Sequence, residues 1–287
     1  MAAQPTASTP TPPFESNEQW DELSRDVKAQ LLQEMGGESW YLIIATVLTV
    51  SDRPHLVAGF WSYLTTHDAS FSTPEAQARL SDRFRDLLLK QLPLIGAPQM
   101  LSALIPLANV QTDGRGVEER GELDQEQWSN TTLPTLHARG IETITSVYGN
   151  LWQNIFKSFG PHRPQVGLHE LTIVYGLYLA DFTHLTPLET ELVAFTSIIC
   201  QGLRGPALWH VRGLGRLLGA RGANDETDKM RRIKDVVRGV KVAVSTVVEF
   251  CGQDMVKRSG LDAANGRLGW PNVGDVVREL GGWGDDE

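Results

Sequence analysis

Cysteine is scarce in this chain of 287 residues, which contains only Cys200 and Cys251. Two cysteines are too few for a disulfide framework, so the sequence predicts a reducing compartment and buried thiols. Long apolar runs are also missing, since the longest, 42–50 and 192–200, fall well short of the roughly 20 residues of a membrane span. These absences exclude a disulfide-stabilised secreted domain and an integral membrane protein.

The charge balance is acidic, with 26 lysines and arginines against 35 aspartates and glutamates, for a net charge of −9. Nucleic acids and anionic membranes bind proteins with an excess of positive charge, so neither partner is expected. The first residues lack a basic stretch followed by an apolar one, and the last residues match no recognised targeting tail. The sequence therefore predicts a cytoplasmic location.

The motifs of several enzyme classes are missing. The chain has no glycine-rich loop of the kind that cradles phosphate, and no nucleophile elbow. His169 and Glu170 resemble the start of a zinc-protease motif, but the second histidine of that motif is absent. We therefore expect neither a metal ion nor a bound cofactor.

What the chain does contain is a succession of helix signals, without a convincing pair of alternating strands, so the predicted fold is all-α. Residues 1–15 are rich in proline, threonine and serine and are predicted to be disordered. Residues 16–108 form a first helical lobe, 109–136 a polar linker or loop, and 137–255 a second helical lobe. Residues 256–287 are a carboxyl-terminal extension.

Helical periodicity is clearest in the second lobe. An apolar helix, a turn with proline and another apolar helix occur twice in the chain, around Pro54 and around Pro206. Two half-similar lobes would explain this echo, although any two helix hairpins share such a pattern. The apolar run 40–50 does not distinguish a strand from a buried helix. In the second lobe we expect helices at about 139–159, 168–180, 187–200, 206–218 and 227–250.

Four short motifs follow one another in the second lobe, namely Arg139-Gly140, Val147-Tyr148-Gly149, Val174-Tyr175-Gly176 and His210-Val211-Arg212-Gly213. In this order and spacing they resemble the motifs of the carboxymuconolactone decarboxylase and AhpD-like family. The resemblance covers about residues 139–255. It implies an AhpD-like helical bundle.

The resemblance implies two chemistries. The AhpD-like members are peroxidases with a Cys-x-x-Cys pair before the histidine, and Leu203 and Pro206 take the places of those cysteines here. Neither side chain forms a thiolate or a disulfide, so a thiol-dependent antioxidant is disfavoured. The decarboxylases require instead a proton donor or acceptor, which the resemblance assigns to His210, with Glu191 as its partner.

The resemblance favours an enzyme that acts on a small organic acid, lactone or related metabolite by proton transfer, with or without decarboxylation. His210 and Glu191 are the candidate catalytic residues. Tyr175 and Trp209 are candidate substrate-binding residues, although all four also fit structural roles. Asp181 stands near the place of a family arginine, which disfavours a dicarboxylate as the substrate.

A non-catalytic homo-oligomer is the alternative from a different class of function. Self-association is expected in either case, because AhpD-like proteins resemble half-bundles that complete their cores against neighbours. Arg212 lies roughly 200° around the helix from His210, so we expect it in a surface ion pair or an interface rather than in the pocket. A basic stripe is expected to face solvent, with an acidic partner as the alternative; its residues are Arg231, Lys234, Arg238 and Lys241.

Overall fold

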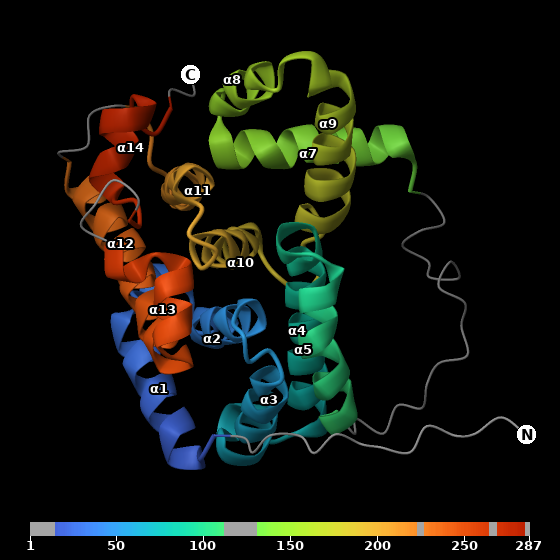
Figure 1. The fold of residues 1–287 in the computed structure, drawn as a ribbon, viewed down its shortest axis with the longest axis vertical. Helices are drawn as coiled ribbons and strands as arrows, with labels where there is room; N and C mark the ends of the chain where they lie inside the picture. Colours follow the sequence, from blue (N-terminus) through green and yellow to red (C-terminus); the bar gives the residue numbers. More distant parts are fainter. Residues whose placement is uncertain (1–14, 112–130, 223–226, 264–268, 285–287) are drawn as a thin grey trace, which may run out of the picture.

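The computed structural model describes residues 15–111, 131–222, 227–263 and 269–284 (Figure 1). Every regular element within these ranges is a helix and none is a strand, so the all-α prediction is confirmed. None of the described helices is both long enough and apolar enough to cross a membrane. The predicted disorder of residues 1–14 and most of the predicted linker lie outside the described residues.

The helices extend into both ends of the predicted 109–136 linker. Before it come α1 (Asn17–Gln30), η1 (Gln33–Met35), α2 (Ser39–Val50), α3 (Leu56–His67), η2 (Ala69–Phe71), α4 (Pro74–Ile95) and α5 (Ala97–Val110). After it come α7 (Leu133–Tyr148), α8 (Leu151–Ser158), η3 (Gly160–His162), α9 (Arg163–His169), η4 (Glu170–Leu179), α10 (Pro187–Ile199), α11 (Arg204–Leu217), α12 (Asp228–Cys251), α13 (Gln253–Ser259), η5 (Leu261–Ala263) and α14 (Val273–Leu280).

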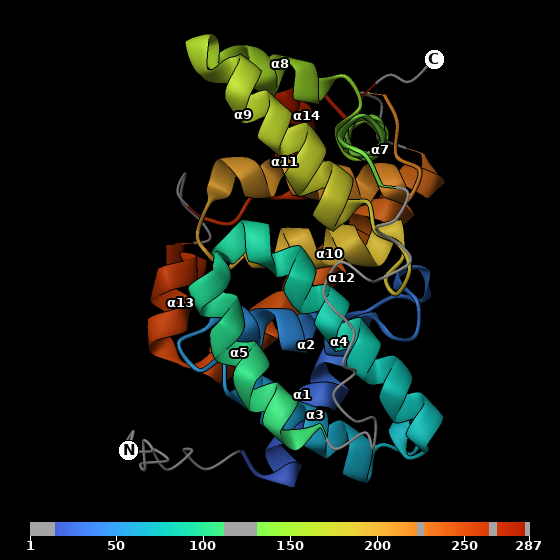
Figure 2. The ribbon, with the colours of Figure 1, turned by 90° about the vertical axis from the view of Figure 1, so that its right-hand side faces the viewer.

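Two apolar helices, α2 and α10, lie side by side at the centre of the molecule (Figure 2). Every residue of α2 is buried, and so is α10 from Thr190 to Ile199. A helix that is apolar on all sides is stable only when neighbours surround it, and α2 contacts α1, α3, α4, α5, α10 and α12. This enclosure decides that the ambiguous run 40–50 is a helix.

The two central hairpins pack reciprocally. α4 follows the α2–α3 hairpin and packs on α10, whereas α12 follows the α10–α11 hairpin and packs on α2. Two half-similar lobes would produce this arrangement. The prolines that mark the echo in the sequence are not equivalent, however, because Pro54 precedes α3 and Pro206 lies within the first turn of α11.

One hydrophobic core runs through both lobes. It contains Trp20 of α1, Phe60 of α3 and Phe195 of α10, together with Trp270 and Trp283 from the last part of the chain. The two lobes are therefore parts of one packed unit. The residues predicted as a carboxyl-terminal extension contribute buried side chains to it.

An outlying layer of α7, α8, α9 and η4 lies beyond α11 and has a small core of its own (Figure 1). The helix predicted at 139–159 is instead two helices, α7 and α8, because Gly149 between them adopts a φ of 52°. Most of 168–180, predicted as an ordinary helix, is the π-helix η4. α7 and η4 approach so closely at Gly140 that a Cβ there would overlap the carbonyl oxygen of Leu171.

Candidate active site

His210 and Glu191 face each other across the α10–α11 hairpin. A capping box of Thr186 and Glu189 starts α10, and Gly202, with a φ of 71°, turns the chain toward α11. His210 Nδ1 lies 2.9 Å from Glu191 Oε1, and the two residues are only 3% and 4% exposed. The structure thus brings the two candidate catalytic residues together in a buried, hydrogen-bonded pair.

Two tyrosines extend this pair into a chain of hydrogen bonds. Tyr148 Oη lies 2.8 Å from His210 Nε2, and the Tyr175 hydroxyl donates to Tyr148 Oη at 2.9 Å. We call Glu191, His210, Tyr148 and Tyr175 the relay. Tyr175 was a predicted site residue, whereas Tyr148 stood out in the sequence only as part of the aromatic–glycine motif before Gly149.

One arrangement of protons satisfies the whole relay. Tyr175 donates to Tyr148, Tyr148 donates to Nε2 of a neutral His210, and the Nδ1–H of His210 donates to the Glu191 carboxylate. When Glu191 is protonated instead, its hydroxyl donates to Nδ1 and the Nε2–H donates to Tyr148. The hydrogen bond between His210 and Glu191 therefore survives a change in the protonation of the carboxyl group.

Burial sets the acidity of the relay. Burial raises the pKa of Glu191 above the usual value of a glutamate, and neighbouring His210 opposes part of this increase. Burial also raises the pKa of Tyr148 and that of Tyr175, so both phenols stay protonated near neutral pH. Glu191 is consequently suited to take up and return a proton, whereas the tyrosines serve as hydrogen-bond donors.

A small cavity reaches two members of the relay, Glu191 and Tyr175. Its unfilled space is about 290 Å³ when the open mouth is counted, but the enclosed part has room for only about one water molecule. Apart from Glu191, its described lining residues are apolar or carry a hydroxyl group, and they include Thr143, Ser146, Phe182, Thr190, Ala194 and Leu217. None of the described lining residues is a lysine or an arginine.

The other two predicted site residues do not line this cavity. His210 lies behind Glu191 and Tyr148, and Trp209 packs against the small core of the outlying layer. Of the four predicted residues, Glu191 and Tyr175 can therefore contact a molecule in the cavity directly. His210 acts on such a molecule through its neighbours.

The glycine that ends the His-x-Arg-Gly motif makes room for the candidate catalytic carboxylate. A Cβ at Gly213 would overlap Glu191 Oε1, so any larger residue there would displace the carboxylate from His210. Within one turn of α11, the motif thus supplies both the imidazole and the space for the carboxylate.

Arg212, the remaining charged residue of the motif, is buried within the chain, so the predicted surface position is wrong. Its guanidinium donates to the carbonyl oxygens of Tyr148 and Gly282, the latter at 2.8 Å. Trp283 next to Gly282 is fully buried and covers this side of α11. Arg212 therefore ties the end of α7, where Tyr148 lies, to the last described residues of the chain.

The thiols are buried and do not line the cavity. Burial raises the pKa of Cys200 and that of Cys251, the latter to about 12, and a neutral thiol is a poor nucleophile. Leu203, at the place of a family cysteine, is 47% exposed, and neither it nor Pro206 lines the cavity. The geometry therefore gives no support to a thiol peroxidase.

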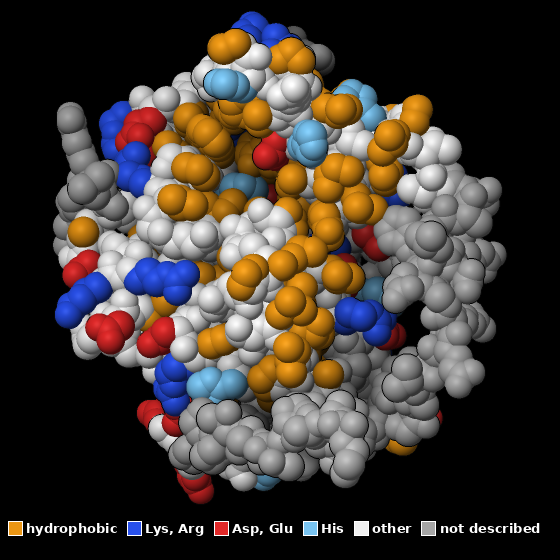
Figure 3. All heavy atoms as spheres, turned by 45° about the vertical axis from the view of Figure 1, so that its right-hand side comes forward, with side chains coloured by type: hydrophobic (Ala, Val, Ile, Leu, Met, Phe, Trp, Pro, Cys, Tyr) orange, Lys and Arg blue, Asp and Glu red, His pale blue; other side chains and the backbone are white. Residues whose placement is uncertain are grey.

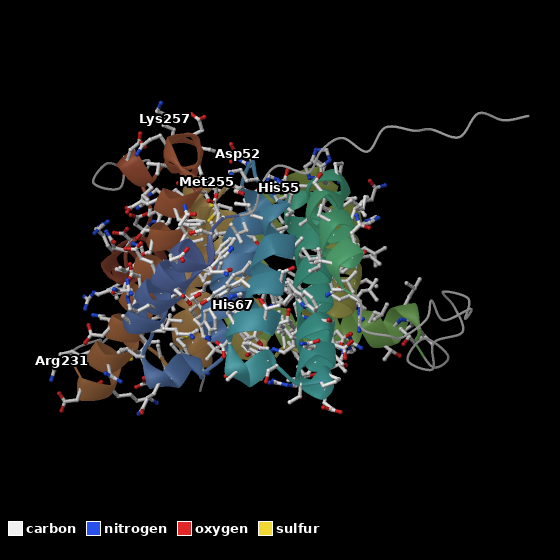
Figure 4. All side chains as sticks on the ribbon, turned by 90° about the horizontal axis from the view of Figure 1, so that it is seen from below. Asp52, His55, His67, Arg231, Met255 and Lys257 are labelled. Atoms are coloured by element: carbon white, nitrogen blue, oxygen red, sulfur yellow. The ribbon has the colours of Figure 1, made fainter. Side chains whose placement is uncertain are left out.

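Within the described ranges, no group of three or more His, Cys, Asp or Glu side chains is placed to hold a metal ion. His55 and His67, for example, lie at the two ends of α3 (Figure 4). The imidazole and the carboxylate of the relay are instead bonded to each other.

Comparison with known proteins gives one distant similarity. No protein-family model matches the chain, and no solved structure matches it. The chain is similar to Peroxisomal protein 2 of Saccharomyces cerevisiae, with 23% identity over 194 residues. The aligned region covers 61% of this chain and 64% of the yeast protein, so the chain spans less than two thirds of its relative.

Proposed function

We propose that the protein is an enzyme that moves a proton on a small, uncharged metabolite bound at Glu191, and that the side chains lining the cavity move apart to admit it. The observation that carries this proposal is the relay, a buried chain of four hydrogen-bonding side chains of which two, Glu191 and Tyr175, line the cavity. Perturbed carboxyl groups next to a histidine in a cavity are typical of proton-transfer sites.

In the proposed reaction, the Glu191 carboxylate takes a proton from a carbon next to a carbonyl group of the metabolite. The Tyr175 hydroxyl, which stays protonated, turns its single O–H from Tyr148 Oη to the substrate oxygen on which negative charge develops. Glu191 then returns the proton to a second carbon, so that a double bond shifts and no atom is gained or lost. His210 positions the carboxylate through its Nδ1 and is itself held by Tyr148.

The cavity favours one part of the substrate class expected from the sequence. A carboxylate needs a cationic anchor, and none of the described lining residues is basic. Asp181 offers none either, because its side chain is itself an acid, which accepts hydrogen bonds from Thr183. A lactone or another neutral carbonyl compound therefore fits better than an organic acid, and isomerisation better than loss of CO₂.

The resemblance to carboxymuconolactone decarboxylases and AhpD-like proteins remains part of this proposal. Three residues of the family-like motifs lie together: His210 is hydrogen-bonded to Glu191, and Gly213 leaves room for the Glu191 carboxylate. Residues of a shared active site would be expected to lie together in this way. The name of the yeast relative points to the peroxisome, which is an alternative to the cytoplasmic location predicted from the sequence.

Native mass spectrometry of the purified protein tests the proposed binding. We expect a small neutral metabolite to co-purify, and we expect Ala194→Leu to reduce its occupancy, because Ala194 lines the cavity and a larger side chain would fill it. Ala97→Leu, at an exposed position in the first turn of α5, is the matched control and should retain the metabolite. Absence of any bound metabolite, together with no binding from a panel of lactones, would contradict the proposal.

A non-catalytic homo-oligomer is the second candidate, and exposed apolar side chains favour the oligomeric part of it. Figure 3 shows hydrophobic side chains gathered on one face of the molecule. Exposed residues of α4, α5, α7 and α9 include Leu89, Leu101, Ile105, Leu133 and Leu168. Apolar patches on a soluble protein usually mark contacts with other molecules.

We therefore propose self-association through the α5 surface, where Ile105 is 60% exposed. Multi-angle light scattering at micromolar concentration should give at least twice the chain mass of 31.7 kDa. Ile105→Glu should shift the distribution toward the monomer, because it places a charge in an apolar contact. A monomer for the unmodified chain would contradict self-association and would leave the proposed enzyme unaffected.

A further inference from the structure

A second hollow lies on the outer side of α12, at the end of the basic stripe. Its unfilled space, including open solvent, is about 770 Å³, and it shares no described lining residue with the Glu191 cavity. We call it the Lys241 groove. It is lined by Arg238, Lys241, Val242, Ser245, Leu261, Trp270 and Asn272.

Lys241 is partly buried, and the hydrogen-bond partners of its ammonium among the described residues are neutral. Its ammonium donates to the carbonyl oxygen of Pro271 at 2.6 Å and to Asn272 Oδ1 at 2.7 Å, which leaves one N–H donor. Burial lowers the pKa of Lys241 to about 8, and the more distant Asp275 opposes part of this decrease.

Among the described residues, no carboxylate lies within ion-pair distance of Lys241. Asp275 is occupied elsewhere, by the side chains of Arg204 and Arg278 and by the backbone N–H of Asn272. Lys90, another buried lysine, has its aspartate at 2.8 Å. Lys241 therefore keeps a positive charge that no described residue directly neutralises, and such a charge favours an anionic ligand.

A second cation stands beside it. Arg238 lies one turn earlier on α12, and its ion pair with Asp235 joins two side chains that are both more than half exposed. Such exposed pairs contribute little and are readily exchanged for another anion. The apolar part of the groove comes from Val242, Leu261 and Trp270.

We propose that the Lys241 groove binds a small carboxylate with an apolar chain, the carboxylate between Lys241 and Arg238 and the chain against Trp270 and Leu261. The groove is of the size that proteins use for small molecules, which favours a metabolite over a macromolecular partner. The chain carries a net charge of −9, so such an anion would be held by local rather than overall attraction.

Isothermal titration of the full chain with sodium octanoate tests this inference. We expect octanoate to bind and octanol, which has the same chain length without the charge, to bind at least about tenfold more weakly, because a hydrogen bond to a charged group contributes that much. Lys241→Met should weaken octanoate binding on the order of tenfold. Lys234→Met is the matched control, since Lys234 belongs to the same stripe on α12 but does not line the groove.

The inference would be overturned by no octanoate binding to the unmodified chain, by equal binding of octanol and octanoate, or by equal weakening in Lys234→Met and Lys241→Met. Lys241→Arg guards against misfolding of the methionine variant, because it keeps the charge and should keep at least part of the binding. Loss of binding in Lys241→Arg with an unchanged melting temperature would also contradict the proposed role of the charge. None of these outcomes depends on the chemistry proposed at Glu191.

Discussion

Replacing Glu191 by Gln is expected to lower turnover of the cavity's substrate by about 10²- to 10⁴-fold, the usual contribution of a positioned acid–base group. The amide keeps the shape of the side chain and can still accept from His210 Nδ1, but it cannot take up a proton. Since the change also removes a buried ionisable group, the melting temperature should not fall enough to explain the loss. Steady-state kinetics with the metabolite identified by mass spectrometry would measure it.

Matched variants separate this role from general effects on the protein. Glu249→Gln makes the same change at an exposed position of α12 and should leave turnover unchanged. Cys200→Ser should preserve activity, because the thiol is buried and does not line the cavity. His210→Gln should lower turnover while leaving the protein folded. Activity that is lost in Cys200→Ser but kept in Glu191→Gln and His210→Gln would mean that thiol chemistry operates instead.

The pH dependence of the same reaction should follow the acidity of Glu191. The carboxylate must be ionised to take a proton, so kcat/KM should fall as the pH decreases through the pKa of this group. Because burial raises that pKa, the decline should begin at a higher pH than for an ordinary glutamate. In Glu191→Gln, the remaining activity should lack this acidic limb.

The largest loss of stability is expected from Gly140→Ala, at about 3 kcal/mol or more. A methyl group at this position would overlap the carbonyl oxygen of Leu171, which belongs to the backbone and cannot rotate away. α7 and η4 would have to separate, and overpacking of this kind normally costs about 1–3 kcal/mol even where side chains can adjust. Separation of these helices would also pull Tyr148 away from Tyr175 and break the relay.

Chemical denaturation of this variant has a control within the same protein. Gly205→Ala also replaces a helical glycine, in the first turn of α11, but its new methyl group meets no atom within 4 Å. It should leave stability unchanged or raise it by up to about 1 kcal/mol, since alanine favours a helix over glycine. Equal effects of the two substitutions would show that α7 and η4 do not pack as closely as described.

Secondary structure was predictable because it depends on short-range patterns, whereas the pairing of His210 with Glu191 was expected from the family resemblance. Helical periodicity and capping residues locate α10, α11 and α12 to within a few residues. His210 and Glu191 lie on two consecutive helices of one hairpin, so their side chains can come into contact without any other part of the chain. Periodicity alone does not show whether the run that forms α2 is a helix or a strand, because it is apolar on every side. It is a helix in the structure, where six other helices enclose it.

The rest of the site depends on contacts between distant parts of the chain. Tyr148 reaches His210 across 62 positions, and the short motif around Tyr148 does not by itself separate it from a core tyrosine. The angle around α11 between Arg212 and His210 predicts a surface position for Arg212, but Gly282, 70 positions away in the sequence, covers that side. The sequence by itself determined helices, one hairpin and the residue types of the pair. Tertiary packing decided which side chains surround that pair. It also decided that Glu191, rather than His210, reaches the cavity. The physical reason is that the burial of a side chain depends on the neighbouring helices and not on its own segment alone.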